Sequence, residues 1–222
     1  MCGRKTLTKD MQSIIEELAI QDWEDPDNYA PSYNIAPTQT SPILIDDGHR
    51  RVRLMRWGLI PAWSKDDKYG ARMINARTET IREKPAFRGL LPNKRCVVIT
   101  DGYYEWRKSG SGKQPYYIHP SGGGLLPMAG LWDRWVKPDG ETVYSYTVIT
   151  TTPQPGLAYI HDRMPVILLQ EDLDVWLQTK INSADMALPL LRPYGKKLEA
   201  YPVSNIVNSP ANNSPACVQP MN

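Results

Sequence analysis

The first part of the chain has the hydrophobic spacing of an amphipathic helix. Its apolar residues recur at intervals of three and four positions, at Leu7, Met11, Ile14, Ile15 and Leu18. This spacing places them on one face of a helix, and Thr8 is available as its N-terminal cap. The pattern therefore predicts a helix over roughly residues 8–20.

Short runs of β-branched, aromatic and aliphatic residues dominate the rest of the chain. These runs are residues 43–45, 52–57, 96–100, 103–106, 116–119, 125–132, 144–150 and 165–169. The segments Asp46-Asp47-Gly48 and Pro138-Asp139-Gly140 are typical of hairpin turns. Residues 26–40 contain three prolines and are expected to form a loop. Two short helices are predicted near residues 171–179 and 184–191.

Many strands at short spacing with a few helices predict an α+β fold. We expect a curved or barrel-like, mainly antiparallel β-sheet with flanking helices. The length suits a single domain over residues 1–222. Residues 207–222 hold three prolines and four asparagines, so an irregular tail is expected there.

Composition and charge narrow the class of protein. The chain is 41% hydrophobic and 23% charged, which is typical of a globular protein, and its net charge is only +2. A nucleic-acid partner is neither required nor excluded, because a local basic patch would have to supply the attraction. No apolar run is long enough to span a membrane, and no signal-peptide pattern follows Arg4 and Lys5. We expect a cytoplasmic, monomeric protein that does not bind a membrane.

The three cysteines do not form a metal or disulfide pattern. An odd count without Cys-x-x-Cys spacing argues against a disulfide framework and a zinc site. No His/Cys cluster has ligand spacing, so neither a metal nor a cofactor is predicted. Cys96 lies in an apolar run and is expected to be buried and inert, and Cys217 is expected to pack within the tail.

Cys2 is the cysteine with a chemical reason for its position. If Met1 is removed, Cys2 carries a free α-amine and a thiol on adjacent carbons. The amine titrates near ~7.7–8.0, so part of it is nucleophilic at neutral pH. It can condense with an aldehyde, and the thiol can then close a thiazolidine ring. Alternatively, the thiol attacks an amide with the amine as its base, or the residue follows the start by chance.

A polar segment, Asn75-Ala76-Arg77-Thr78-Glu79, is the first candidate for binding. An asparagine side chain both donates and accepts hydrogen bonds, and an arginine can bind a phosphate with two parallel donors. The alternative is a structural loop in which Asn75 caps a helix and Arg77 pairs with Glu79. Taken alone, the segment favours this structural alternative.

The segment Asp101-Gly102-Tyr103-Tyr104-Glu105-Trp106 places an acid within an aromatic strand. Strand alternation puts Tyr103 and Glu105 on the same face. If that face is the inner one, Glu105 is a buried carboxyl group with a raised pKa, suited to general acid or base catalysis. The alternative is that Glu105 lies on a solvent-exposed face of the strand, beside Lys108.

Of the three histidines, His161 has both an acid and a base beside it, Asp162 and Arg163. A histidine held there can transfer protons near neutral pH, although a histidine without such company is more often structural. His49 in a turn and His119 at a strand end are expected to be structural.

Seven tryptophans in 222 residues is a high number, and two of them lie with Arg56 in the segment 56–63. Aromatic faces stack on unpaired bases, and nearby arginines hold phosphates. Trp57 is expected in the core, whereas Trp63 precedes a charged loop and is expected to be exposed. A non-enzymatic binder of single-stranded nucleic acid is therefore one alternative function.

Six motifs in order carry a resemblance to a known family. They are Met1-Cys2-Gly3-Arg4, Tyr33-Asn34-Ile35-Ala36-Pro37, Arg56-Trp57-Gly58-Leu59-Ile60-Pro61, Ile74-Asn75-Ala76-Arg77-Thr78-Glu79, Asp101-Gly102-Tyr103-Tyr104-Glu105-Trp106 and His161-Asp162-Arg163-Met164-Pro165. Together they resemble the SRAP (SOS-response-associated peptidase) family, from Cys2 to the Pro215-Ala216-Cys217 tail. In length and order the match is to its single-domain bacterial members, also called abasic site processing proteins.

The resemblance implies a covalent reaction with damaged DNA. Family members recognise abasic sites in single-stranded DNA and link to them through the N-terminal cysteine, which protects the lesion during replication and repair. By resemblance, the amine of Cys2 attacks C1′ of the abasic sugar and its thiol closes the thiazolidine after Met1 is removed. The expected partner is single-stranded DNA with an abasic site, and the expected location is cytoplasmic and nucleoid-associated.

The resemblance also implies roles for individual residues. Glu105 matches the family's acid/base position, His161 the position that opens the sugar ring and reverses the link, and Asn75 the position that holds the abasic nucleotide. The phosphate-binding positions are Arg4, Arg77 and Arg163. The positions near the DNA channel are Asn34, Pro37, Trp63, Trp106 and Thr150.

Two further features bear on the resemblance. Close relatives often carry two aromatic residues where this chain has Trp63 followed by Ser64. The family name also records a self-processing peptidase activity, and here only Met1 precedes Cys2. The rival enzyme is an N-terminal-nucleophile glutamine amidotransferase, which also begins Met-Cys-Gly. The chain has no Asn-Gly oxyanion motif of the expected kind, and little length for a synthase domain.

Overall fold

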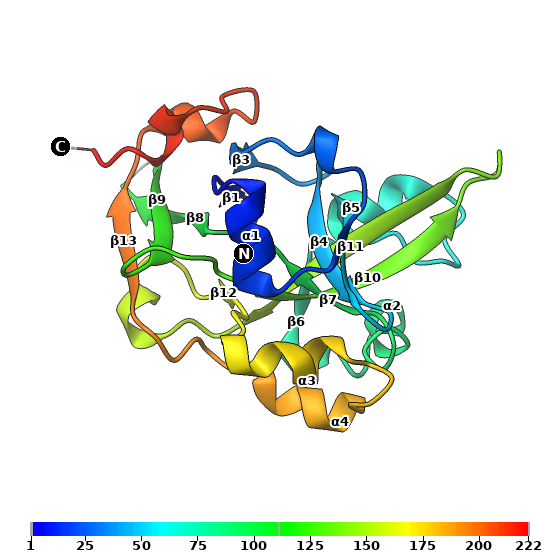
Figure 1. Cartoon of the computed structure of the whole chain (residues 1–222). Helices are drawn as coiled ribbons and strands as arrows, with labels where there is room; N and C mark the ends of the chain where they lie inside the picture. Colours follow the sequence, from blue (N-terminus) through cyan, green and yellow to red (C-terminus); the bar gives the residue numbers. More distant parts are fainter. Residues whose placement is uncertain (1, 111, 222) are drawn as a thin grey trace.

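The computed structural model describes residues 2–110 and 112–221, so Met1, Ser111 and Asn222 lie outside the described residues. At its centre, five strands form a closed ring (Figure 1). In ring order they are β4 (Thr40–Asp46), β5 (Arg50–Trp57), β11 (Thr142–Thr151), β10 (Met128–Val136) and β7 (Arg95–Val98). Neighbours are antiparallel except β5 and β11, whose parallel pairing closes the barrel. Short strands are added at β2 (Asp22–Trp23), β6 (Asn75–Arg77) and β12 (Met164–Pro165).

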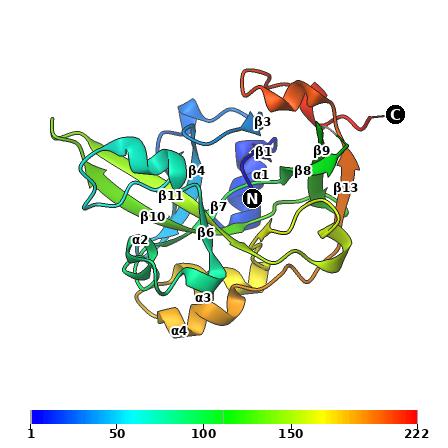
Figure 2. The same cartoon turned by 180° about the vertical axis from the view of Figure 1, so that it is seen from behind.

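A second, fully antiparallel sheet lies beside the barrel, and the N-terminal end lies between the two (Figures 1 and 2). Its strand order is β13 (Leu198–Pro202), β9 (Gly112–Pro120), β8 (Gly102–Ser109), β1 (Lys5–Leu7) and β3 (Ser32–Ile35). The α-helices are α1 (Met11–Leu18), α2 (Pro85–Arg88), α3 (Leu173–Leu177) and α4 (Ala184–Ala187). None of the described helices is long and apolar enough to cross a membrane. The α+β fold with a barrel-like, mainly antiparallel sheet and flanking helices is confirmed.

Helix α1 begins later than its hydrophobic spacing predicts. Its cap is Asp10, whose side chain accepts a hydrogen bond from the backbone N–H of Ser13 at 2.9 Å. Thr8 is not the cap, because its N–H and hydroxyl both donate to Asp101, each at 2.6 Å. The helix ends at Leu18, and its C-cap Ala19 adopts the left-handed conformation with φ 49°. Thr8 therefore ties the chain to Asp101, just before β8, rather than capping the helix.

The two hairpin predictions are confirmed, whereas one predicted loop and one predicted strand are wrong. The turns at 46–48 and 138–140 join β4 to β5 and β10 to β11. The expected loop 26–40 contains β3, because that strand pairs with β1. The expected strand 165–169 overlaps β12 (Met164–Pro165) only at Pro165. After it, the chain leaves β11 and forms an isolated bridge between Ile167 and Met128 at the start of β10.

Part of the tail, for which the sequence predicts irregular structure, packs against the rest of the protein. It contains two 3-10 helices, Asn205–Asn208 and Pro215–Val218. Val207 and Cys217 are fully buried in a small apolar cluster with Tyr104 of β8. The tail therefore forms part of the wall behind β8.

Candidate functional site

Two neighbours fix the backbone of Cys2, which is fully buried between the sheets. On one side the chain runs antiparallel to β8, where Tyr104 N–H donates to the Arg4 carbonyl at 3.0 Å. This register carries Cys2 toward Glu105. On the other side Asn75 Nδ2 donates to the Cys2 carbonyl at 2.8 Å. The sequence-predicted residues Cys2, Asn75 and Glu105 are thus brought together.

The thiol of Cys2 is strongly disfavoured as an anion. Burial raises its pKa to about 12, and the negative charge of Glu105 contributes in the same direction. A thiol with this pKa is protonated at neutral pH. It does not act as a thiolate unless a base removes its proton.

Glu105 is a buried carboxyl group, as strand alternation predicts for the inner face. Its side chain is 3% exposed, and burial raises its pKa to about 7. On the opposite face of β8, a Cβ on Gly102 would lie 2.3 Å from Tyr117 Oη, so the glycine lets that ring approach the strand closely. A carboxyl group that titrates near neutrality can both take up and release a proton under physiological conditions.

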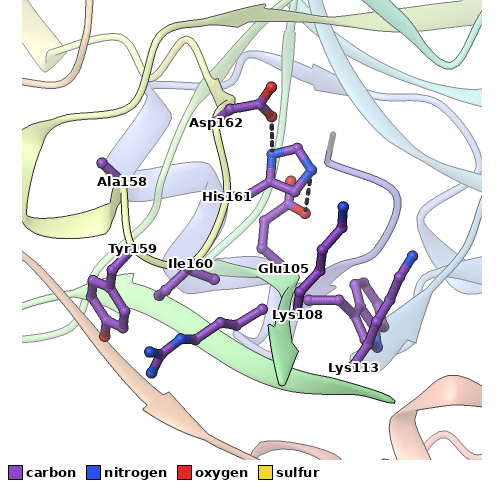
Figure 3. A pocket seen from close by; sticks show the side chains of 10 residues that line it. Glu105, Lys108, Lys113, Ala158, Tyr159, Ile160, His161 and Asp162 are labelled. Atoms are coloured by element: carbon purple, nitrogen blue, oxygen red, sulfur yellow. Dashed lines mark ion pairs between the residues drawn. The ribbon is translucent and has the colours of Figure 1, made fainter. Parts of the chain in front are cut away.

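His161 completes a chain of titratable groups with Glu105 and Asp162 (Figure 3). Its Nε2 lies 3.9 Å from Glu105 Oε2, and its Nδ1 lies 2.8 Å from Asp162 Oδ1. The backbone N–H of Arg163 also points at Nδ1, at 3.0 Å. These two contacts of Nδ1 suit different states, because the amide needs a lone pair and the carboxylate needs an N–H. Burial lowers the pKa of His161, so the neutral ring is favoured near neutral pH.

Glu105 and His161 open onto a cavity of about 540 Å³. Figure 3 shows their side chains facing one another at its wall. The other residues that line it are Trp106, Arg107, Lys108, Lys113, Ala158, Tyr159, Ile160 and Asp162. Among the described residues, no group of three His, Cys, Asp or Glu side chains could hold a metal ion.

Asn75 lies in a strand, so the alternative that it caps a helix is wrong. Strand β6 pairs in parallel with β11, which places Asn75 opposite Val148. While Nδ2 binds the Cys2 carbonyl, Oδ1 is buried and has no hydrogen-bond partner among the described residues. Asn75 also lines a second groove, of about 350 Å³, together with Trp63 and Phe87. Two neighbours of Cys2, Glu105 and Asn75, therefore each line a different opening.

Arg163 and Thr150 lie together at the end of this strand pair. Arg163 binds Glu79 through both terminal nitrogens, at 2.6 and 3.0 Å, and donates to the Thr150 carbonyl at 2.5 Å. Its hydrogen bonds lower the pKa of Glu79 to about 2. The alternative that Arg77 pairs with Glu79 is therefore wrong. Arg77 lies opposite Thr150, is exposed, and has no ion pair among the described residues.

Arg4, Asn34 and Trp106 hold the tail in place. Arg4 Nη1 donates to Asn34 Oδ1 at 2.8 Å and to the Val207 carbonyl at 2.6 Å. The indole of Trp106 donates to Asn208 Oδ1 at 2.7 Å. Asn34 Nδ2 donates to three tail carbonyls, those of Val207, Ser209 and Asn212. A phosphate-binding role for Arg4 stays a prediction, and in this structure its guanidinium is committed to the protein.

Trp63 is exposed and Trp57 is buried, as predicted. The ring of Trp63 packs edge-on against Tyr69 at 5.5 Å between centroids, so Tyr69 supplies a second aromatic side chain. Ser64, which follows Trp63, is buried and donates to a backbone carbonyl. Pro37 is half-buried, two residues after the end of β3.

Lys5 and Tyr103 are two buried polar residues at the site whose importance the sequence did not indicate. Lys5 Nζ donates to the Ile99 carbonyl at 3.3 Å, and burial lowers its pKa to about 7. Tyr103 Oη is buried without a hydrogen-bond partner among the described residues. Alternation placed Tyr103 on the face of Glu105, but nothing in the sequence distinguished Lys5 from a solvated lysine.

Comparisons with known proteins show the family to which the chain belongs. A sequence model of the SOS response associated peptidase (SRAP) family matches residues 1–210. The Bacillus subtilis (strain 168) protein named abasic site processing protein YoqW is 45% identical over 222 residues, which cover 99% of each chain. Abasic site processing protein HMCES of Gallus gallus is 35% identical over all of this chain and 78% of its own length. A crystal structure of a Bacteroides thetaiotaomicron protein superposes with a TM-score of 0.88 at 31% identity, over 99% of this chain and 100% of the other. The chain therefore belongs to the SRAP family.

Proposed function

We propose that the protein processes abasic sites in single-stranded DNA by forming a covalent thiazolidine link through Cys2, once Met1 has been removed. The observation that carries the proposal is the placement of Cys2 between the Asn75 amide and the buried carboxyl group of Glu105. The names of the relatives support the same target. The link would shield the lesion while it is replicated or repaired.

The chemistry follows from the two nucleophiles on one residue. In its ring-opened form, an abasic deoxyribose carries an aldehyde at C1′. The Cys2 amine adds to this carbon, and loss of water gives a Schiff base. The thiol then adds to the same carbon while its proton passes to the nitrogen, which closes the ring with one water as the by-product. The raised pKa of the thiol makes the amine the first nucleophile.

The neighbouring residues take complementary roles. Glu105, with a pKa of about 7, accepts a proton from the amine and returns it to the departing hydroxyl. His161 moves protons at the sugar oxygen and during reversal, within reach of Glu105. Asn75 holds the Cys2 carbonyl with Nδ2 and offers Oδ1 to a sugar hydroxyl. The exposed Arg77 binds an adjacent phosphate.

The test mixes the protein with an oligonucleotide that carries one abasic site and separates the products on a denaturing gel. Intact mass spectrometry first establishes that Met1 is absent. A slow-migrating covalent band is expected for the native chain and for Cys217→Ser, and none for Cys2→Ser. Absence of the band from protein that has lost Met1 would refute the proposal. Release of ammonia from glutamine would instead support the amidotransferase alternative.

The same measurement tests the peptidase activity that the family name records. If the protein removes Met1 itself, Glu105→Gln should retain Met1 while the native chain loses it. Equal loss from both would indicate that a cellular aminopeptidase removes the residue.

A further inference from the structure

The hairpin formed by β8 and β9 carries two lysines that face each other across the strands. Lys108 pairs directly with Lys113 across the two strands. Like charges directly opposite one another in a sheet are destabilising. Both side chains are exposed, and neither forms an ion pair among the described residues. Figure 3 shows them extending side by side toward His161 at the cavity wall.

An exposed aromatic ring lies at the same cavity. Tyr159 is 50% exposed, yet neighbours hold its ring on two sides. It packs edge-on against Tyr116 at 5.9 Å between centroids, and the Arg107 guanidinium lies 5.4 Å from the ring centre. A rigid, half-exposed ring beside three cations is the combination that binds single-stranded nucleic acid.

We propose that Arg107, Lys108, Lys113 and Tyr159 form a binding subsite for the stretch of single-stranded DNA that leaves the lesion past His161. In this hairpin subsite, the two lysines neutralise backbone phosphates and an unpaired base stacks on Tyr159. An anionic backbone fits because it removes the repulsion that the strand pairing otherwise imposes. The inference rests on the proposed function and names where the undamaged part of the strand binds.

The test measures binding of a fluorescent, undamaged single-stranded oligonucleotide by anisotropy at several salt concentrations. Each phosphate contact contributes about 0.7 to the slope of log K against log salt, so Lys108→Gln/Lys113→Gln should reduce that slope by about 1.4. The control Lys196→Gln/Lys197→Gln removes the same charge from another exposed pair and should leave the slope unchanged. Tyr159→Ala should weaken binding about fivefold or more, and Tyr159→Phe should not.

Failure of the subsite and failure of the proposed function give different results. With saturating abasic DNA, the hairpin variants should still cross-link to completion, which Cys2→Ser does not. Equal salt slopes for the two double-lysine variants would overturn the subsite while leaving cross-linking intact. Absence of cross-linking by the native chain would refute the proposed function. The salt slope of DNA binding would still decide whether single-stranded DNA binds at the hairpin subsite. Lys108→Gln/Lys113→Gln should also unfold at no lower urea concentration than the native chain, since it relieves a repulsion.

Discussion

Replacing Lys5 with methionine should stabilise the protein, and the gain should depend on pH. Lys5 is fully buried, and its amine donates to the Ile99 carbonyl. Burial lowers its pKa from 10.5 to about 7. Because each pKa unit corresponds to about 1.4 kcal/mol, enclosing the charged amine costs about 5 kcal/mol. Methionine fills nearly the same volume without a charge, so Lys5→Met should recover much of this energy at neutral pH.

The sign of the pH dependence follows from proton binding. Between about pH 7 and pH 10.5 the unfolded chain holds a proton on Lys5 that the folded chain does not, so native stability rises by about 1.4 kcal/mol per pH unit. Below about pH 7 both states are protonated and the cost is constant. Lys5→Met lacks this slope. Its advantage is therefore largest below pH 7 and falls by about 3 kcal/mol between pH 7 and pH 9.

Urea unfolding followed by tryptophan fluorescence measures both free energies across this pH range. Lys196→Met is the matched control, because Lys196 is exposed and the substitution is the same. It should show no such trend. A stability difference between Lys5→Met and the native chain that is equal at pH 7 and pH 9 would refute the reasoning. So would a variant less stable than the native chain at pH 7.

Three further predictions concern the site. Glu105→Gln should abolish the rise in the initial cross-linking rate through about pH 7. It should also raise the free energy of unfolding above that pH by about 3 kcal/mol, because burial penalises the carboxylate of the native chain. An unchanged pH–rate profile would contradict the role of Glu105 as base. Asn75→Ala should slow cross-linking at saturating DNA about tenfold or more, because the variant loses the hydrogen bond to the Cys2 carbonyl. The DNA affinity measured by anisotropy should change little. A change in affinity without a change in rate would contradict this role. Glu79→Gln should free Arg163 and steepen the salt dependence of DNA binding by about 0.7, whereas Glu83→Gln, which also removes an exposed acid, should not.

The barrel could be predicted because its strands contain runs of β-branched, aromatic and aliphatic residues, and because two of its connections are hairpin turns of recognisable composition. The strands that position the site could not. Strand β1, Lys5–Leu7, contains a lysine and a threonine, and β6, Asn75–Arg77, is mostly polar. Both segments are strands because neighbouring strands form hydrogen bonds with their backbones. Backbone pairing of so short a segment leaves no hydrophobic periodicity in the sequence.

In the candidate site too, some features could be predicted from the sequence and others could not. Burial of Glu105 followed from alternation along one strand, which is a local rule. The partner of Glu79 could not be predicted by a local rule, because Arg163 lies 84 residues away while Arg77 is a near neighbour in sequence. Sequence proximity suggested the wrong pair, and only the path of the fold decided the right one.

The bonds of Arg4 to the tail have a consequence for the order in which the site is assembled. Arg4 binds the carbonyl of Val207, 203 residues further along the chain. A ribosome that adds about 5 to 20 residues per second needs on the order of 10 to 40 s to make that stretch. Throughout this time, the start of the chain lacks the segment that secures it beside β8. The proposed nucleophile, two residues before Arg4, therefore leaves the ribosome well before Arg4 gains its bonds to the tail, which leaves an aminopeptidase time to reach Met1.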